Sequence, residues 1–415
     1  MELKQFCSLM ELSGDAEHLL KNHWDKILQA WDGSMPEFLS ETFIRKHLPF
    51  LQIPEDEAEI LTRSTLVIRE CAADEFRRFY VFVLHYAALV LKLQPTGVLK
   101  SPVWGENEGI VYLIAALSSA PLIAENCRKK GIPEHYATDV LQWIGGTVGM
   151  YKLGHNGIPG HALGQIYVLG EHIAGKIYRI GRFEYMVHRL PEWMPLIFRN
   201  DKGVFAILAA PGMKFNAAGL VTLKDEVIES FIEEEGNFIT GIPCTVEGIA
   251  RVGERLTIDK REFKPLCSPW DTVPSIHIPG GLPMSWADAI SSMKEAKEFF
   301  RCYLKKEVPM LICGSWILNP ALEKFAPEGN MARFRRETFN LPMIRWGDKG
   351  RDGMFFAFGR NDVDPTEITP VNSIQKILQE IFKAEGTLRT GAMFVLCEDL
   401  DKLGEQYYRK HAEVL

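Results

Sequence analysis

The stretch VPSIHIPGGLPMSWADAISSMKEAKEFFRCYLKKEVPMLICGSWILNPALEKFAPEGNMARF, residues 273–334, decides the fold. It begins with a short run of β-forming residues, Val273–Ile278, and passes through Pro279–Gly281 into a long amphipathic helix that starts near Ser285. A second apolar run, Val308–Leu318, follows, and a shorter helix is predicted after it. Because a helix connects the two strands, we expect them to pair in parallel.

The glycine turn in this stretch has the chemistry of an anion site. Gly280 and Gly281 lack Cβ atoms, which lets backbone N–H groups approach a ligand closely. Ser285 suits the N-cap position of the helix, with Asp288 three residues later in a variant of the capping box. The helix dipole favours negative charge there, and we predict that the backbone of Ile278–Leu282 and the helix start at Ser285 bind a phosphate group. The alternative is an ordinary strand-to-helix turn.

Three polar side chains lie at the ends of the two predicted strands. His277 is a candidate general base, because a free imidazole titrates near neutral pH, although a hydrogen-bonded core histidine is the alternative. Ser315 and Asn319 flank the end of the second strand and could donate hydrogen bonds to a ligand, although Asn319 could equally cap a helix. We therefore predict His277 and Ser315 as catalytic residues and Asn319 as a cofactor contact.

Composition limits the class of protein. A chain of 415 residues is too long for one compact core, so two domains are expected. A net charge of −7 argues against a nucleic-acid or anionic membrane surface but leaves a small anionic cofactor open. The eight cysteines form no CxxC pair, so reduced core cysteines are expected, and the N-terminus has no secretory signal pattern. We expect a cytoplasmic protein without a metal site that binds a small molecule, with a homo-oligomer left open.

The periodicity changes along the chain. Residues 1–150 predict a helical domain, residues 151–176 a linker with a connecting helix, and residues 177–415 a sheet domain that begins with antiparallel strands. Later segments carry weaker signals. We expect a helix or surface loop over Glu226–Glu235 and a closing pair of strands over Arg335–Phe339 and Gly353–Phe358. Residues 398–415 predict a charged helix. Arg333, Arg335 and Arg336 predict a solvated basic edge.

The element order and several short motifs resemble a known family. The motifs are IGRFEY at 180–185, ITGIP at 239–243, HIPGG at 277–281, SWILNP at 315–320 and ARF at 332–334. Together they resemble bacterial acyltransferase domain-containing proteins, which pair a helical N-terminal domain with a GNAT-like C-terminal domain. The resemblance implies an α+β fold, in which an all-α domain precedes a mixed, mainly antiparallel β-sheet flanked by helices.

The resemblance also implies an activity. In the GNAT superfamily the strand-to-helix turn holds the pyrophosphate of acyl-CoA, and the splayed strands hold its pantetheine. We therefore expect an acyl-CoA-dependent N-acyltransferase that uses acetyl-CoA or another acyl-CoA as co-substrate. The chain departs from the usual pattern, since IPGGLP lacks the leading Gln or Arg and the final small residue, and Phe325 stands near the place of the usual tyrosine acid. The alternative is a non-catalytic GNAT-fold protein that binds CoA or another metabolite.

Overall fold

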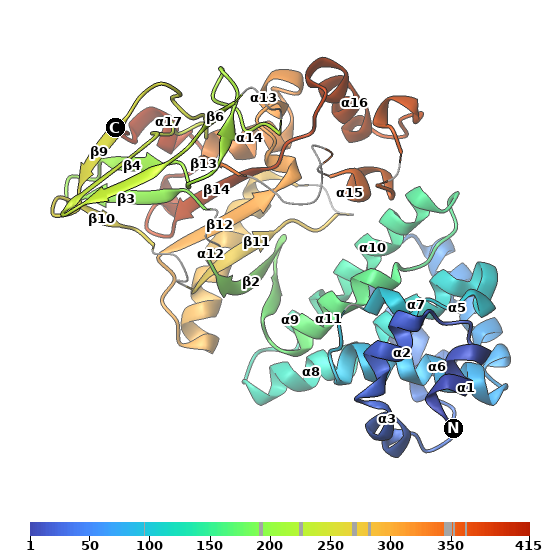
Figure 1. Ribbon diagram of the computed structural model, residues 1–415. Coiled ribbons are helices and arrows are strands. Elements are labelled where there is room, and N and C mark those ends of the chain that lie inside the picture. The colour runs from blue at the N-terminus through green and yellow to red at the C-terminus, as the bar shows by residue number, and fades with distance from the viewer. Residues whose placement is uncertain are drawn as a thin grey trace. The chain divides into compact units, whose positions relative to one another are not determined.

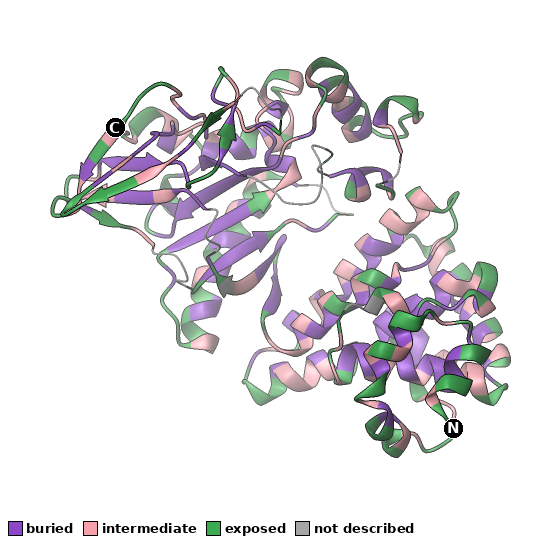
Figure 2. Cartoon of the chain, in the orientation of Figure 1, coloured by how far each residue is buried: buried purple, intermediate pink, exposed green. Residues whose placement is uncertain are grey.

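The structure is a computed structural model, and it describes residues 1–94, 96–190, 194–223, 227–267, 272–280, 284–343, 351, 353–361 and 363–415. The chain divides into two compact units. The first, here the helical unit, comprises Met1–Arg179 and Pro279–Leu282, and the second, the sheet unit, comprises Ile180–Ile278 and Pro283–Leu415. Figure 1 shows the elements of each unit, and Figure 2 shows that each has its own buried interior.

The helical unit is built around α7, Glu108–Leu117, whose residues from Gly109 onward are all buried. One stretch around it, Pro102–Lys129, is long and apolar enough to cross a membrane, but 72% of its apolar window is buried, as in the core helix of a globular domain. The other α-helices of this unit are α1 Leu3–Leu9, α2 Gly14–Lys21, α3 Trp24–Ala30, α4 Glu41–His47, α5 Glu55–Cys71, α6 Glu75–His85, α8 Ala120–Lys129, α9 His135–Asp139, α10 Leu141–Gly154 and α11 Ile166–Ile173.

The sheet unit contains a six-stranded mixed sheet in the order β1-β2-β11-β12-β14-β13. Strands β11 and β12 pair in parallel, as the helical connection predicts, and the pairs β2–β11, β12–β14 and β13–β14 are antiparallel. This confirms the predicted α+β architecture with a mixed, mainly antiparallel sheet. The strands are β1 Ile177–Ile180, β2 Phe183–Arg189, β11 Thr272–His277, β12 Met310–Ser315, β13 Phe339–Pro342 and β14 Gly391–Leu396.

Helix α12, Trp286–Leu304, connects β11 to β12 and is fastened to the sheet by a buried serine. Ser292 Oγ donates to the Ile180 carbonyl oxygen at 2.6 Å and accepts from the Phe183 N–H at 3.2 Å. The same oxygen lies 3.0 Å from the hydroxyl of Tyr185. Gly181, with φ +55°, turns the chain beside this serine, where a Cβ would lie 3.3 Å from that of Ser292. The helix is therefore held against β2 by polar contacts as well as by its apolar face.

A β-lobe of small sheets is inserted between β2 and β11. One sheet has the order β10-β3-β4 and another the order β7-β8-β9, and the two share a core that includes Phe198, Leu208 and Ile239. The hairpin of β3 and β4 turns at residues 200–203 and pairs Arg199 with Phe205. The bounds are β3 Leu196–Asn200, β4 Phe205–Leu208, β5 Lys214–Phe215, β6 Ile228–Glu229, β7 Ile232–Glu235, β8 Phe238–Gly241, β9 Leu256–Asp259 and β10 Phe263–Pro265.

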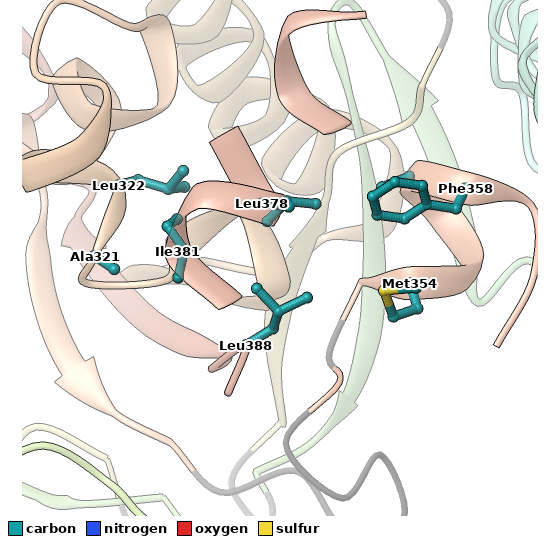
Figure 3. Close-up of a cluster of buried hydrophobic side chains, with 8 residues drawn as sticks. Ala321, Leu322, Met354, Phe358, Leu378, Ile381 and Leu388 are labelled. Carbon is teal, nitrogen blue, oxygen red and sulfur yellow. The ribbon is translucent and has the colours of Figure 1, made fainter. Parts of the chain in front are cut away.

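Short helices lie around the other end of the sheet. Helices α13 Leu322–Phe325 and α14 Asn330–Glu337 follow β12, and α15 Met354–Phe358 and α16 Ser373–Glu385 lie between β13 and β14. Apolar side chains from α13, α15 and α16 meet in the cluster drawn in Figure 3, whose members are Ala321, Leu322, Met354, Ala357, Phe358, Leu378, Ile381 and Leu388.

Four segments with weak sequence signals differ from their predicted structure. The acidic segment Glu226–Glu235 contains β6 and β7 instead of a helix, because its glutamates pair with cations, such as Glu233 with Arg255, across the small sheet. The predicted closing strand over Gly353–Phe358 is the short helix α15, which glycines with positive φ bound at both ends.

The other two segments are Arg335–Phe339 and the tail 398–415. The segment Arg335–Phe339 contains the end of α14 and the beginning of β13, so only its last residue belongs to a strand. The tail 398–415 has a 3-10 turn, Leu400–Lys402, and one short helix, α17 Tyr407–His411. A continuous helix does not form there, because backbone groups of the tail hydrogen-bond to other parts of the chain. For example, the Phe205 N–H donates to the Glu413 carbonyl at 2.8 Å.

Candidate functional site

The parallel strands β11 and β12 share a single ladder pair among the described residues, and the unpaired stretch beyond it is here called the gap. Strand β11 pairs with β2 along six residues, from Thr272 to His277, but its ladder with β12 has the single pair Ser275–Ile312. Beyond that pair, Ile276–Ile278 and Cys313–Ser315 have no ladder partners in each other, although all of these residues are described. Backbone groups without a ladder partner can hydrogen-bond an extended ligand.

His277 is the last residue of β11 and is exposed at this gap. Its partner across the antiparallel ladder is Glu184 of β2, whose side chain is 2% exposed. Directly opposed residues of an antiparallel pair place their side chains on the same face of the sheet. The imidazole therefore has a buried carboxylate as its cross-strand neighbour, and both residues have further interactions.

The face that carries His277 is opposite to the face covered by α12. Phe183 and Tyr185 flank Glu184 along β2, and their rings contact Phe334 of α14 and Phe300 of α12. Because side chains alternate along a strand, Glu184 and its partner His277 point to the other face. Helix α12 thus does not cover the imidazole.

Small residues continue this face beyond His277. Two residues past the Ser275–Ile312 pair, β12 has Gly314, which is exposed and has no side chain to stand beside the imidazole. Gly314 pairs with Ala392 of β14, the next strand in the sheet. In this row the histidine stands beside a glycine and an alanine, neither of which has a long side chain.

Ser315 and Asn319 lie at the end of β12 and use their side chains in the local turn. Ser315 Oγ accepts a hydrogen bond from the Ile317 N–H at 3.4 Å. Asn319 is 1% exposed, and its Oδ1 accepts from the Ala321 N–H at 3.0 Å in a local turn, whereas the N-cap of the following helix α13 is Ala321. Its Nδ2 has no hydrogen-bond partner among the described residues. The predicted ligand contacts of Ser315 and Asn319 stay predictions.

The start of α12 is capped as expected. Ser285 is the N-cap, and its Oγ accepts from the Asp288 N–H at 3.1 Å and donates to the Asp288 carboxylate at 2.5 Å. Ile278 is half-buried and follows His277 directly. The predicted phosphate role of these residues stays a prediction.

The glycine turn itself is only partly described. Gly281 and Leu282 lie outside the described residues. Gly280 is exposed and is grouped with the helical unit, where a Cβ on Gly146 of α10 would lie 2.9 Å from the Gly280 carbonyl oxygen.

A buried arginine supports the turn that follows β12. Arg335 is 2% exposed, which makes the predicted solvated edge wrong for this residue. Its guanidinium donates to the carbonyl oxygens of Leu318 and Glu247 and pairs with Glu323 at 3.0 Å. Burial lowers the pKa of Arg335 to about 10, and the carboxylate of Glu323 opposes that shift, so the side chain stays charged at neutral pH.

A nucleophilic cysteine is not part of this site. Cys313 lies on β12 near its carboxyl end and is 2% exposed. Burial raises the pKa of its thiol to about 12, so it stays protonated at neutral pH and is a poor nucleophile.

Sequence reasoning found His277 but missed Glu184. The residue lies within the IGRFEY motif, between two aromatic residues of a strand, where an acid in an apolar run is a signal of a buried charge. Its pairing with His277 depends on the register between two strands that the whole β-lobe separates in sequence.

Comparison with known proteins agrees with this geometry. Residues 177–394, more than half of the chain, match the family model described as a GNAT-like C-terminal domain. No curated protein sequence matches the chain.

Several solved structures are similar over nearly the whole chain. An acyltransferase in complex with decanoyl-CoA and teicoplanin has a TM-score of 0.61 at 15% identity, over 95% of this chain and 99% of that one. An acyltransferase in complex with CoA and 10C-teicoplanin has a TM-score of 0.60 at 16% identity, with the same coverage. An acyltransferase mutant in complex with octanoyl-CoA has a TM-score of 0.60 at 15% identity, again over 95% and 99%. At these identities the likeness shows a shared fold.

Proposed function

Because the chain belongs to the family defined by the GNAT-like C-terminal domain, we propose that it is an acyl-CoA-dependent N-acyltransferase. It moves an acyl group from the CoA thioester to the amine of a small molecule. The observation that carries the proposal is the gap between β11 and β12, where the ladder ends at Ser275–Ile312 and an exposed histidine follows. The solved acyltransferases with the same fold, in complex with CoA or an acyl-CoA, support it.

The reaction needs an acceptor for one proton. The amine nitrogen attacks the thioester carbonyl carbon and forms the C–N bond, the C–S bond breaks, and CoA leaves as the thiolate. The amine gives up a proton, and His277 is the base that we assign to it. The thiolate takes up a proton as it leaves, so the balance is an amide and free CoA. Backbone N–H groups at the gap are the donors available to the carbonyl oxygen.

Holding the two reactants together supplies a large part of such a rate enhancement. The parted backbones of Ile276–Ile278 and Cys313–Ser315 suit an extended ligand with amide groups, since they offer donors and acceptors along both sides. Ser285, at the start of α12, is a further contact for the cofactor, with the helix dipole behind it. The acyl chain is left to experiment, with acetyl, octanoyl and decanoyl groups as the range to test.

Calorimetric titration with CoA, acetyl-CoA, octanoyl-CoA and decanoyl-CoA is the first test. We expect at least one to bind, and release of free thiol in the presence of an amine panel should follow. Absence of both heat and a thermal shift at millimolar ligand would overturn the proposal. CoA binding without thiol release across the panel would favour the alternative, a non-catalytic binding protein. The differences from the usual GNAT pattern in IPGGLP and at Phe325 are the reason to keep that alternative.

Replacement of the base separates catalysis from binding. His277→Ala should lower turnover by about 100-fold or more and leave CoA affinity largely unchanged, because the imidazole acts in the proton transfer. His18→Ala, which removes an exposed histidine from α2 of the helical unit, is the matched control and should keep full turnover. Equal turnover in His277→Ala and the parent protein would remove the base from the proposal.

We place the protein in the cytoplasm. The eight cysteines form no disulfide among the described residues, and five of them are buried, which suits a reducing compartment. Fractionation of cells that express the full chain tests this placement.

A further inference from the structure

Ser275 of β11 lies at the ladder pair that precedes the gap. It pairs with Ile312 of β12 on one side and with Met186 of β2 on the other. The gap begins with the next residue of β11, Ile276. Ser275 is therefore the residue of β11 at the closed, inner end of the gap.

The side chain of Ser275 faces the side of the sheet opposite to α12. Its neighbour Ile276 pairs with Tyr185, whose hydroxyl lies 3.0 Å from Ser292 Oγ of α12. Because side chains alternate along a strand, Ser275 and His277 both point to the other face. Ser275 thus lies two residues further into the sheet than His277, on the same face.

The row of side chains that continues from Ser275 across the sheet is apolar. Ile312 pairs with Phe394 of β14, and Phe394 pairs with Phe339 of β13. The rings of Phe339 and Phe394 have centroids 4.7 Å apart, and both contact Phe205 of the β-lobe. A hydroxyl at the end of such a row has few protein groups to hydrogen-bond and is costly to bury without a partner.

Ser275 differs from the other buried serines because its hydroxyl has no protein partner. It is 8% exposed, and its Oγ makes no hydrogen bond among the described residues. Every other buried serine that the structure describes donates its hydroxyl to a backbone carbonyl, namely Ser101, Ser118, Ser119, Ser230 and Ser292. A buried hydroxyl without a partner lowers stability, so the protein gains nothing from it unless a ligand completes the hydrogen bond.

We propose that Ser275 is a catalytic residue whose hydroxyl donates a hydrogen bond to the thioester carbonyl oxygen of the bound acyl-CoA. When the amine nitrogen adds to the carbonyl carbon, negative charge develops on that oxygen, and a fixed donor stabilises it. The charge returns to the carbon as the C–S bond breaks, and Ser275 keeps its proton throughout. The inference deepens the proposed acyl transfer, rests on it, and adds a side-chain donor to the backbone donors of the gap.

The direction in which the cofactor enters the gap brings the thioester to this serine. The phosphate groups lie outside, toward Ser285 at the start of α12, which follows the carboxyl end of β11. The extended arm of CoA then runs inward between Ile276–Ile278 and Cys313–Ser315, and its amide groups pair with the strand backbones. Its reacting end is innermost, at the Ser275–Ile312 pair. A thioester has an acceptor oxygen and no N–H, so a hydroxyl donor is the group that it requires.

Ser275→Ala separates a role in catalysis from a role in folding. We expect kcat to fall by about 100-fold or more, as for removal of one donor to an oxyanion, while KM for the acyl-CoA stays near that of the parent. The Tm should not fall, because no protein group loses a partner. Ser275→Thr keeps the hydroxyl and should recover part of the lost kcat. Ser291→Ala, at an exposed position of α12, is the control and should keep the parent kcat.

Infrared spectra of bound acyl-CoA test the contact without an amine and without turnover. The probes are acetyl-CoA, octanoyl-CoA and decanoyl-CoA, each labelled with carbon-13 at the thioester carbonyl. A hydrogen bond to the oxygen lowers the stretching frequency of the carbonyl. We expect a band below that of the free ligand in the parent protein, in Ser275→Thr and in Ser291→Ala, and a shift toward the free-ligand frequency in Ser275→Ala.

Each outcome of these measurements decides the proposal. A parent-like carbonyl band in Ser275→Ala overturns it, whether or not kcat falls. If Ser275→Ala does not fold, Ser275→Thr and Ser275→Val decide, because they have the same shape and differ in the hydroxyl, and equal bands in these two variants overturn it. A band that depends on the hydroxyl in a protein that transfers no acyl group supports the contact and contradicts only the proposed function. Failure of all three probes to bind overturns the proposed function and this inference with it.

Discussion

A Cβ placed on Gly391 would lie 2.1 Å from the carbonyl oxygen of Leu318. Gly391 opens β14 and pairs with Ser315, the last residue of β12, so the contact lies directly beside the end of the parallel pair. The Leu318 oxygen accepts a hydrogen bond from Arg335 and cannot retreat without losing it. The turn that follows β12 therefore requires glycine at position 391, because a side chain there would collide with the Leu318 carbonyl.

Gly391→Ala should destabilise the sheet unit. The methyl group meets a backbone carbonyl that a buried guanidinium holds in place, and overpacking of this kind costs about 1–3 kcal/mol. Urea unfolding of the variant and the parent measures the difference in free energy. A stability equal to that of the parent would mean that the Leu318 carbonyl is free to move, contrary to the contact with Arg335.

Ser292 gives a prediction with a control on the same helix. Ser292→Ala removes the partner of the Ile180 carbonyl and of the Phe183 N–H, and each buried group left without a partner costs about 1–3 kcal/mol. Ser291→Ala, one residue earlier on the exposed side of α12, should change stability by a few tenths of a kcal/mol at most, through helix propensity alone.

Thermal unfolding of the two serine variants provides the measurement. The expected order is a clearly lower Tm for Ser292→Ala and a Tm near that of the parent for Ser291→Ala. Equal values for the two variants would show that the buried hydroxyl does not hold α12 to the β1–β2 turn.

Glu323 joins two arginines and gives a prediction that depends on pH. It pairs with Arg335 at 3.0 Å and with Arg409 at 2.7 Å, and so connects α13, α14 and the C-terminal helix α17. Burial by itself raises the pKa of Glu323, but hydrogen bonds from Arg409 and the charges of both arginines outweigh it, so its pKa lies below the ordinary value.

The sign of the pH effect follows from this lowered pKa. The ion pairs stabilise the folded state fully above the unfolded glutamate pKa of about 4.3 and lose that contribution as pH falls through the lower folded pKa. At neutral pH, Glu323→Gln leaves Arg335 buried without its anion, which should cost about 3 kcal/mol.

The control for Glu323 is the exposed pair of Glu298 and Arg301, whose side chains are 55% and 53% exposed. Glu298→Gln should leave the unfolding free energy unchanged within error, because exposed pairs contribute little. Urea unfolding at pH 7 compares the two variants. A similar, small effect for both would show that the Arg335–Glu323–Arg409 group does not act as a buried network.

Much of the sheet unit could be predicted from the stretch 273–334. Strand, turn, helix and strand follow from period and turn chemistry, the parallel pairing follows from the helical crossover, and Ser285 caps α12 as its sequence indicates. These features are local, or depend on one general rule of chain topology. The same holds for the hairpin at residues 200–203, where the turn residues determine the connection.

The remaining features depend on contacts between distant parts of the chain. The pairing of Glu184 with His277 is set by a register that closes over the whole β-lobe. Arginine is a residue type that usually lies at the surface. The burial of Arg335 is tolerable because it pairs with Glu323 and donates to the Leu318 carbonyl. In the aromatic segment Gly353–Phe358, positive φ at both flanking glycines allows a short helix where residue type favours a strand.

We expect the helical unit to lose stability in mild acid because of the buried residue His161. It is 0% exposed, and burial lowers its pKa to about 4, partly opposed by the Nδ1–H bond to the Ala162 carbonyl at 2.9 Å. Unfolded histidine binds its proton near pH 6.5. Below that pH only the unfolded state is protonated, so stability is full above about pH 6.5 and falls as pH decreases toward 4.

Unfolding at several values between pH 7.5 and 4.5, followed by far-ultraviolet circular dichroism, measures this slope. His161→Asn retains an N–H donor for the Ala162 carbonyl but has no titrating group, so its slope should be smaller by up to about 1.4 kcal/mol per pH unit. His18→Asn, at an exposed position of α2, is the control and should keep the slope of the parent. Equal slopes for His161→Asn and the parent would contradict the buried neutral imidazole.

Replacement of glycine by alanine should have opposite effects on stability at two positions of α10. A Cβ on Gly145 would lie 2.0 Å from the Leu51 carbonyl oxygen, whereas a Cβ on Gly149, one turn later and exposed, meets nothing within 4 Å. Gly145→Ala should therefore destabilise the helical unit by about 1–3 kcal/mol or more, because a backbone must move. Gly149→Ala should stabilise it by up to about 1 kcal/mol, because alanine loses less conformational entropy in a helix. Thermal unfolding of both variants separates these outcomes, and a Tm shift of the same sign in both would show that α10 does not pack as closely on Leu51 as the structure describes.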